Sequence, residues 1–141
     1  MQSVEPAVAL GVVGAGAFLL IGMLTGIWKY AWMRRPPDHR APLYVDIAHR
    51  AALLYAPACL VLAALAWLAR MPGGIEVAAV AVNEAFFAAA VASYLFHGVR
   101  GTERTQMAER NFLTVWGMYA LIVGEIGGTT VLLIGALRAL A

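Results

Sequence analysis

Four long apolar stretches limit what this chain can fold into more than any other feature of its sequence. They run from about residue 7 to 28, 51 to 69, 77 to 96 and 112 to 137. An α-helix needs about 20 mostly apolar residues to cross the roughly 30 Å of hydrocarbon in a bilayer. Backbone polar groups find no water there, so a segment that crosses must satisfy them internally, as a helix does. The pattern therefore predicts four transmembrane helices.

With the residues that flank each stretch, we expect helices over about 7–33, 43–70, 75–99 and 111–138. They use most of the 141 residues, so we predict a single all-α membrane domain over residues 1–141, folded as a four-helix bundle. The composition agrees, because 62% of the residues are hydrophobic and 13% are charged. Soluble domains are about 45–50% apolar and about 25% charged. The lipid bilayer is thus the expected partner of much of the surface.

The positions of the basic residues predict how the helices are oriented in the membrane. Eight of the ten lie in the loops after the first and third stretches, namely Lys29, Arg34, Arg35, Arg40, Arg50, Arg100, Arg104 and Arg110. Cytoplasmic loops are enriched in basic residues. We therefore expect both chain ends on the non-cytoplasmic side of a bacterial inner (plasma) membrane. Topology already explains these charges, so the net charge of +2 does not indicate nucleic-acid binding.

Small residues are spaced so that helices can pack closely. Gly22 with Gly26, and Gly124 with Gly128, have the GxxxG spacing. In lipid, where packing drives helix association, such pairs let two backbones approach each other. They predict either an interface between subunits, in a homo-oligomer or a larger membrane complex, or packing within the four-helix unit. The single cysteine, Cys59, is interpreted as a small buried apolar residue.

Two histidines are expected at the same depth, at the cytoplasmic rim. His49 and His97 each lie 24 residues from the centre of the outer turn, one on either arm of a helical hairpin. Such a pair can ligate the iron of a b-type haem, or hold a divalent metal with Asp46 as a third ligand. Arg50 and Arg100 can bind an anionic group. The alternative is that both histidines only hydrogen-bond water, lipid headgroups or loop carbonyls.

Two glutamates interrupt the apolar stretches near mid-membrane. Glu84 and Glu125 are both expected about 20 Å from the cytoplasmic rim, where a carboxylate costs a few kcal/mol even on lenient scales. Each should face the bundle interior and be protonated or paired, and Asn83 and Thr129 can supply hydrogen bonds. The functional interpretation is a proton or cation step, or a contact with a quinone-like or polar lipid ligand. The alternative is a structural hydrogen bond between helices.

The start of the second stretch resembles a known family of small membrane proteins. It reads AlaHisArg at 48–50, followed by Tyr55 and Pro57. This arrangement, on four helices, resembles the membrane-associated eicosanoid and glutathione metabolism superfamily. The resemblance implies a trimer that binds glutathione between its subunits. His49 and Arg50 carry over, with Arg100 as a further anion contact.

This sequence also departs from that family's pattern. The family's Asn and Glu near the start of the same helix correspond to Ala51 and Leu54. Since those two polar residues contact the thiol tripeptide, the departure puts glutathione chemistry in doubt. The shared trait would then be the trimeric scaffold.

Three functions remain open. The first is a binding or accessory subunit that holds a lipophilic ligand, haem or partner through the rim cluster and the mid-membrane carboxylates. The second is a membrane enzyme of the glutathione-linked type, and the third is a small proton-coupled transporter that uses Glu84 and Glu125. Phosphate loops, GxSxG elbows and HExxH motifs are absent from the sequence, so the signatures of soluble enzymes give no support for catalysis. Whether the chain is an enzyme stays open.

Overall fold

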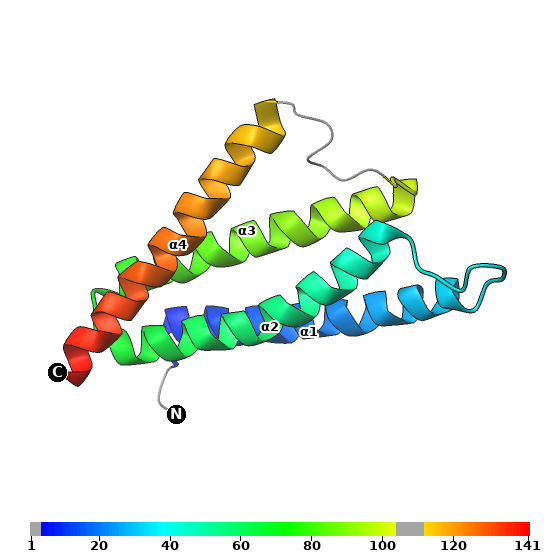
Figure 1. The fold of residues 1–141 in the computed structure, drawn as a ribbon. Coiled ribbons are helices and arrows are strands. Elements are labelled where there is room, and N and C mark those ends of the chain that lie inside the picture. Colours follow the sequence, from blue (N-terminus) through cyan, green and yellow to red (C-terminus); the bar gives the residue numbers. More distant parts are fainter. Residues whose placement is uncertain (1–3, 104–111) are drawn as a thin grey trace.

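The computed structural model describes residues 4–103 and 112–141, and these form four α-helices (Figure 1). Their bounds are α1 Pro6–Met33, α2 Leu43–Ala69, α3 Gly73–Arg100 and α4 Phe112–Leu140. Each helix begins and ends within two residues of the expected position. Two of the basic residues expected in the loop between the third and fourth helices, Arg104 and Arg110, lie outside the described residues.

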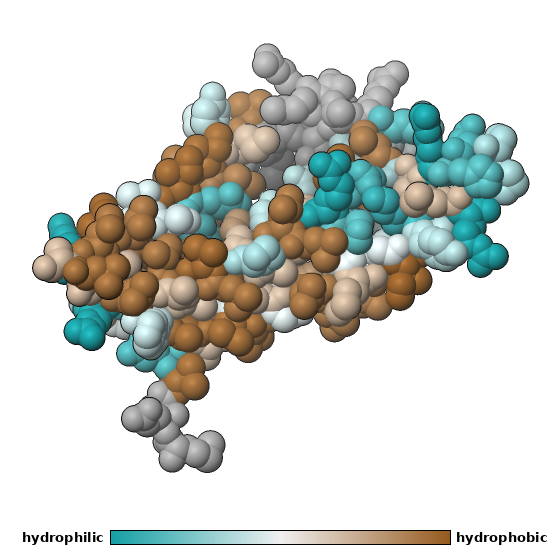
Figure 2. Space-filling model, turned by 60° about the horizontal axis from the view of Figure 1, so that its bottom comes forward, coloured by the Kyte–Doolittle hydropathy of each residue, from teal (hydrophilic) through white to brown (hydrophobic). Residues whose placement is uncertain are grey.

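All four helices are long and apolar enough to cross a membrane. Large apolar side chains on their outer faces are exposed, for example Val99 at 78% and Val123 at 72%. Figure 2 shows apolar residues over much of the visible surface, with hydrophilic residues gathered towards the ends of the helices. A soluble protein rarely exposes apolar patches of this extent. The described fold is therefore that of an integral membrane protein.

Prolines and left-handed residues set the helix ends. Pro6 occupies the first turn of α1, where its fixed φ suits a helix and its missing N–H costs nothing. Pro72 precedes α3 in an extended conformation. At the other end of α3, Gly101 has a φ of 65°, which glycine adopts without strain, and its N–H donates to the carbonyl of Gly98. These residues mark the start of α1 and both ends of α3.

The core runs along α2, which packs against the other three helices. Its buried face includes a stripe of small residues at helical spacing: Ala48, Ala52, Ala56, Cys59, Ala63 and Ala66. Small side chains let neighbouring backbones come close, which is how helices pack in lipid. Pro57 lies within this helix, and Figure 1 shows α2 bending midway along its length. A proline inside a helix removes one backbone hydrogen bond and bends the axis.

The GxxxG pairs pack inside the bundle. A Cβ at Gly22 would collide with the Leu53 side chain of α2, and Gly124 lies against Phe86 of α3. Gly128 also faces α3, where a Cβ would lie 2.9 Å from the carbonyl oxygen of Ala79. Of the two interpretations of these glycines, the structure shows packing within the four-helix unit.

Helix α4 is the least enclosed of the four. Only 17% of its membrane-spanning window is buried, against 28–39% for the other helices. Figure 1 shows its C-terminal half beside the other helices, while its first half diverges from α3. Both chain ends lie at the same end of the bundle in that view.

Candidate functional site

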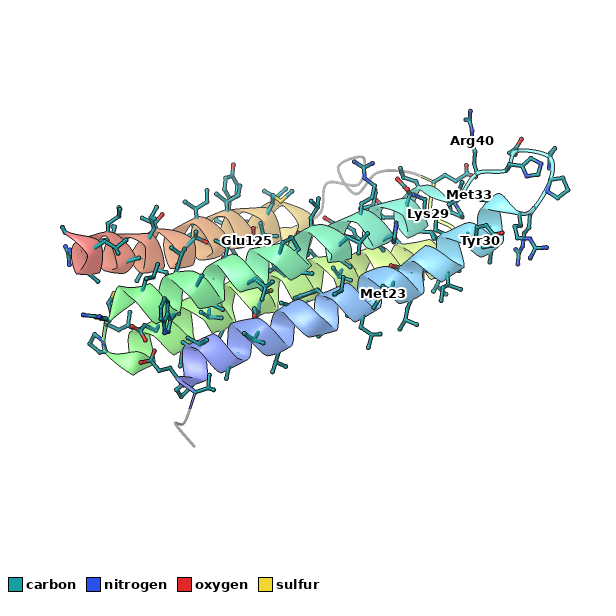
Figure 3. The ribbon with its side chains drawn as sticks, turned by 90° about the horizontal axis from the view of Figure 1, so that it is seen from below. Met23, Lys29, Tyr30, Met33, Arg40 and Glu125 are labelled. Atoms are coloured by element: carbon teal, nitrogen blue, oxygen red, sulfur yellow. The ribbon has the colours of Figure 1, made fainter. Side chains whose placement is uncertain are left out.

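The rim carboxylate is already paired with two cations. Asp46, in the first turn of α2, lies 2.6 Å from Nζ of Lys29 through Oδ1 and 3.5 Å from Nη1 of Arg50 through Oδ2. Figure 3 shows Lys29 near the end of α1, on the side of the first loop. Exposed ion pairs of this kind contribute about 0–1 kcal/mol each. The Lys29–Asp46 pair joins the end of α1 to the start of α2, whereas the Arg50–Asp46 pair lies within α2.

His49 joins the same two helices one turn deeper. Its Nδ1 donates to the carbonyl oxygen of Gly22 at 2.9 Å. Gly26 leaves room for the ring, since a Cβ there would lie 3.0 Å from the imidazole Cε1. The hydroxyl of Thr25 donates to that same carbonyl of Gly22 at 3.0 Å. His49 therefore acts as an interhelical hydrogen-bond donor at a glycine-lined crossing.

His97 has a different set of neighbours. Its Nδ1 lies 3.4 Å from the hydroxyl oxygen of Thr102, and its ring lies 4.9 Å from the ring of Tyr44. The guanidinium of Arg100 stacks over Phe96 at 4.2 Å. The rim residues of α3 thus contact the end of their own helix and the first turn of α2.

The positions of these rim side chains test whether His49, His97 and Asp46 could share a metal ion. Among residues 4–103 and 112–141, no three His, Cys, Asp or Glu side chains lie close enough together to hold a metal ion. His49, His97 and Asp46 therefore do not form the expected three-ligand site. Arg50 and Arg100, the expected anion contacts, each have a separate partner, Asp46 for the first and Phe96 for the second.

Near mid-membrane, a hydrogen bond joins α3 to α4. Asn83 is 1% exposed, and its Oδ1 accepts a hydrogen bond from the hydroxyl of Thr129 at 3.2 Å. Its amide nitrogen donates to the carbonyl of Ala79 at 2.9 Å. Gly128, next to Thr129, provides the close approach that this bond requires. The structure thus brings together two of the four residues expected at a mid-membrane site.

Glu84 projects from α3 towards α1, about 100° around the helix from Asn83. Its carboxyl lies directly over Gly14, where a Cβ would overlap the carboxylate oxygens. Cys59 on α2 is a near neighbour of this carboxyl. One oxygen, Oε1, is buried and has no hydrogen-bond partner. An unsatisfied buried acceptor is costly, and in a native protein it calls for an explanation.

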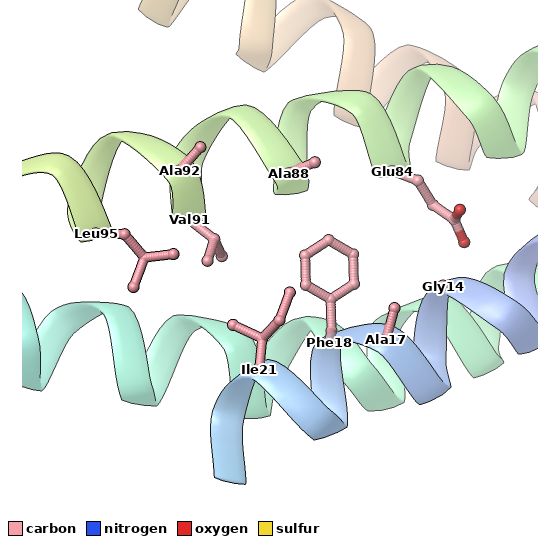
Figure 4. A pocket seen from close by; sticks show the side chains of 9 residues that line it. All are labelled: Gly14, Ala17, Phe18, Ile21, Glu84, Ala88, Val91, Ala92 and Leu95. Carbon is pink, nitrogen blue, oxygen red and sulfur yellow. The ribbon is translucent and has the colours of Figure 1, made fainter. Parts of the chain in front are cut away.

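The carboxyl of Glu84 lies at one end of a cavity between α1 and α3 (Figure 4). The cavity has a volume of about 310 Å³. It is lined by Gly14, Ala17, Phe18, Ile21, Glu84, Ala88, Val91, Ala92 and Leu95. The lining residues follow one stripe on each helix, and many of them are small, which is why the two helices leave space between them. Figure 4 shows Phe18 reaching into the cavity from α1, with Leu95 at the end away from Glu84.

Glu125 lies elsewhere. It sits near the middle of α4 (Figure 3). Its Oε1 is likewise buried without a partner. The two glutamates share a depth in the sequence pattern, but Glu84 lies against Gly14 of α1, whereas Glu125 is not among the residues that line the cavity. They are two separate polar positions.

Sequence reasoning did not single out Gly14, which lines the cavity beside the Glu84 carboxyl. Cys59, expected to be a small buried residue, is fully buried in the core on α2. The one available signal was that Gly14, like Gly11, is a small residue spaced along α1. That spacing does not indicate which helix Gly14 faces.

Comparison of the chain with protein-family models, with curated proteins and with solved structures finds no match. Any functional statement therefore depends on the site itself.

Proposed function

We propose that this protein binds a lipophilic small molecule within the membrane, in the cavity between α1 and α3, with the polar group of that molecule at Glu84. The observation that carries the proposal is the buried, unpartnered Oε1 of Glu84 at the end of a largely apolar cavity of about 310 Å³. Small-molecule sites have this form, a mostly apolar cavity of about 300–1,000 Å³ with a few polar groups. An ionisable residue at this depth is a functional candidate by default.

A ligand can enter this cavity from the side. Ala17, Ala88 and Ala92 line it and are exposed on the outer surface of the bundle, where hydrocarbon surrounds the helices. An apolar molecule dissolved in the bilayer therefore needs no path through water. Its binding replaces lipid contacts with protein contacts, and the selective part of the interaction is the hydrogen bond to Glu84.

We also propose an orientation and a location for this site. The excess of basic residues at the α1–α2 and α3–α4 ends favours a cytoplasmic position for those loops, with both chain ends outside a bacterial plasma membrane. In that orientation the cavity extends from mid-membrane towards the cytoplasmic leaflet. A homo-oligomer stays a prediction, which the exposed apolar face of α4 would accommodate.

The proposal can be tested with a photoreactive alcohol. The protein would be reconstituted in phosphatidylcholine nanodiscs and irradiated with a decyl alcohol that carries a diazirine, and labelled residues would be located by peptide mass spectrometry. We expect label to concentrate in residues 14–21 and 84–95. Label spread evenly over the lipid-facing surfaces of all four helices would contradict the proposal.

Two matched variants test whether the ligand binds in the cavity or on the neighbouring surface of α3. Ala88→Leu fills the cavity, whereas Ala89→Leu adds the same bulk to an exposed neighbour that does not line it. The first change should abolish the concentrated labelling, and the second should leave it intact. Equal labelling of the two variants would show that the cavity is not the binding site.

A second candidate function is proton-coupled transport. It is favoured by the presence of two buried carboxyl oxygens without partners, on Glu84 and Glu125. In liposomes with an imposed proton gradient, Glu125→Gln should then abolish uptake of the ligand that Glu84 binds. Uptake that is unchanged by this substitution would remove transport through Glu125 and leave simple binding.

A further inference from the structure

The ionisable groups around the proposed binding cavity favour a ligand of one charge. Of the nine described residues that line it, Glu84 is the one with an ionisable side chain, and no Lys, Arg or His is among them. Lys29, near the end of α1, and Arg50, on α2, are both paired with Asp46. An ionised Glu84 therefore has no counter-charge in the cavity.

Taken with the proposed function, on which it rests, this arrangement leads to one class of ligand. We infer that the cavity binds a lipophilic ammonium, a protonated amine with a linear apolar tail. Its N–H group donates to the unpartnered Oε1 of Glu84, and its positive charge offsets the carboxylate. Charge-assisted hydrogen bonds of this kind are about twice as strong as neutral ones, and the low dielectric of the membrane strengthens them further.

An aromatic ring lies close to the expected position of the ammonium. Phe18 is one helical turn from Gly14, over which the Glu84 carboxyl rests, and Figure 4 shows its ring projecting into the cavity. The ring is held in place by Tyr55 and Phe87, at centroid distances of 5.8 and 6.2 Å. Cations bind to the faces of aromatic rings when desolvated. Phe18 is thus an aromatic member of the same cavity lining as Glu84.

The shape of the cavity indicates the form of the tail. On α3 the lining extends from Glu84 to Leu95, which is eleven residues or about 16 Å along the helix axis. The lining beyond Phe18 is aliphatic, with Ile21, Val91 and Leu95. A linear chain of about ten carbons has a length comparable to this span. An anionic amphiphile would instead place its charge against the carboxylate of Glu84.

Charge selectivity can be measured by competition for the photolabel. Decylammonium, decan-1-ol and decyl sulfate share one tail and carry positive, neutral and negative head groups. Each would be titrated against the diazirine alcohol in phosphatidylcholine nanodiscs, with concentrations corrected for partition into empty nanodiscs. We expect decylammonium to displace the label at about tenfold lower concentration than decan-1-ol. Decyl sulfate should not displace it.

Glu84→Gln should remove this selectivity while preserving the cavity. In that variant we expect the label to bind as before and decylammonium to compete no better than decan-1-ol. The same substitution at the other mid-membrane acid, Glu125→Gln, should keep the preference for the ammonium.

The outcomes separate the two proposals. Localised labelling with equal displacement by all three compounds, or a preference for ammonium that survives Glu84→Gln, would overturn the cation inference and leave the binding function intact. Labelling that is not localised in the wild-type protein would overturn the proposed function, and the inference with it.

Discussion

At the residue scale, the site depends on what surrounds a single carboxyl. Glu84 was identifiable from the sequence because a charged group in an apolar stretch stands out. Its partners were not, because Gly14 and Cys59 resemble the many other small residues of their helices. The carboxyl fits only because Gly14 has no side chain, and it stays partly unsatisfied because α1 offers no donor at that position.

The contact between Glu84 and Gly14 gives a first prediction. Gly14→Ala places a Cβ where the carboxyl lies, and the flexible end of the glutamate must move. We expect the helices to assemble normally but the cavity photolabel, and its displacement by decylammonium, to fall several-fold. Gly16→Ala is the control, since a Cβ there meets nothing within 4 Å. Equal ligand displacement in both variants would argue against a role for the carboxyl position.

A second prediction concerns the α3–α4 hydrogen bond. Thr129→Val keeps the shape of the side chain and removes the hydroxyl that donates to Asn83. Interhelical hydrogen bonds in membranes contribute about 0.6 kcal/mol on average. Unfolding measured by steric trapping in bicelles should show a loss of about this size. Thr130→Val, on the exposed side of α4, should leave the free energy of unfolding unchanged, and a similar loss in both would contradict the assignment.

At the element scale, the helices were predictable and their rotations were not. Uniformly apolar stretches and flanking Pro, Gly and basic residues mark where helices begin and end, so the expected bounds lie within two residues of the observed ones. In lipid, however, both the buried and the exposed faces are apolar, so hydrophobic periodicity does not say which face points inwards. That is why Glu84 and Glu125, expected at one depth, could not be assigned to different neighbours.

Adjacent glycines on α4 provide a third prediction, about how that helix packs. A Cβ at Gly128 would lie 2.9 Å from the carbonyl oxygen of Ala79, which is backbone and cannot move aside alone. Gly128→Ala should therefore lower the free energy of unfolding by about 1–3 kcal/mol, as overpacking does. Gly127 faces open space, so Gly127→Ala should be neutral or slightly stabilising. A reversed order of the two variants in steric trapping would show that α4 packs with another face.

At the scale of the whole molecule, the described helices leave a small cavity with an acidic end between α1 and α3. The cavity arises because α1 and α3 meet along small residues. No local pattern in the sequence predicts such a space. The rim histidines illustrate the same limit. Their common depth suggested a shared ligand, but in the bundle His49 bonds to α1 while His97 contacts Thr102 and Tyr44.

The arrangement of the chain in the membrane gives a fourth prediction. In spheroplasts, whose plasma membrane is intact, short epitope tags at the two chain ends should both be accessible from outside, because an even number of spans returns the chain to the same face. A tag inserted at residue 38, in the first loop, should become accessible only after the spheroplasts are permeabilised. Tags on the two ends that report opposite faces would refute the topology.

The proposed binding site requires that lipid-soluble molecules can reach the carboxyl group of Glu84 through the cavity. Dicyclohexylcarbodiimide, a lipophilic reagent for carboxyl groups, would test this in nanodiscs, with modified residues located by mass spectrometry and Glu125 as the internal reference. We predict modification of Glu84 in the wild-type protein and in Ala89→Leu, and a strong reduction in Ala88→Leu with modification of Glu125 unchanged. Equal modification of Glu84 in all three proteins, or none in any while Glu125 reacts, would contradict the account.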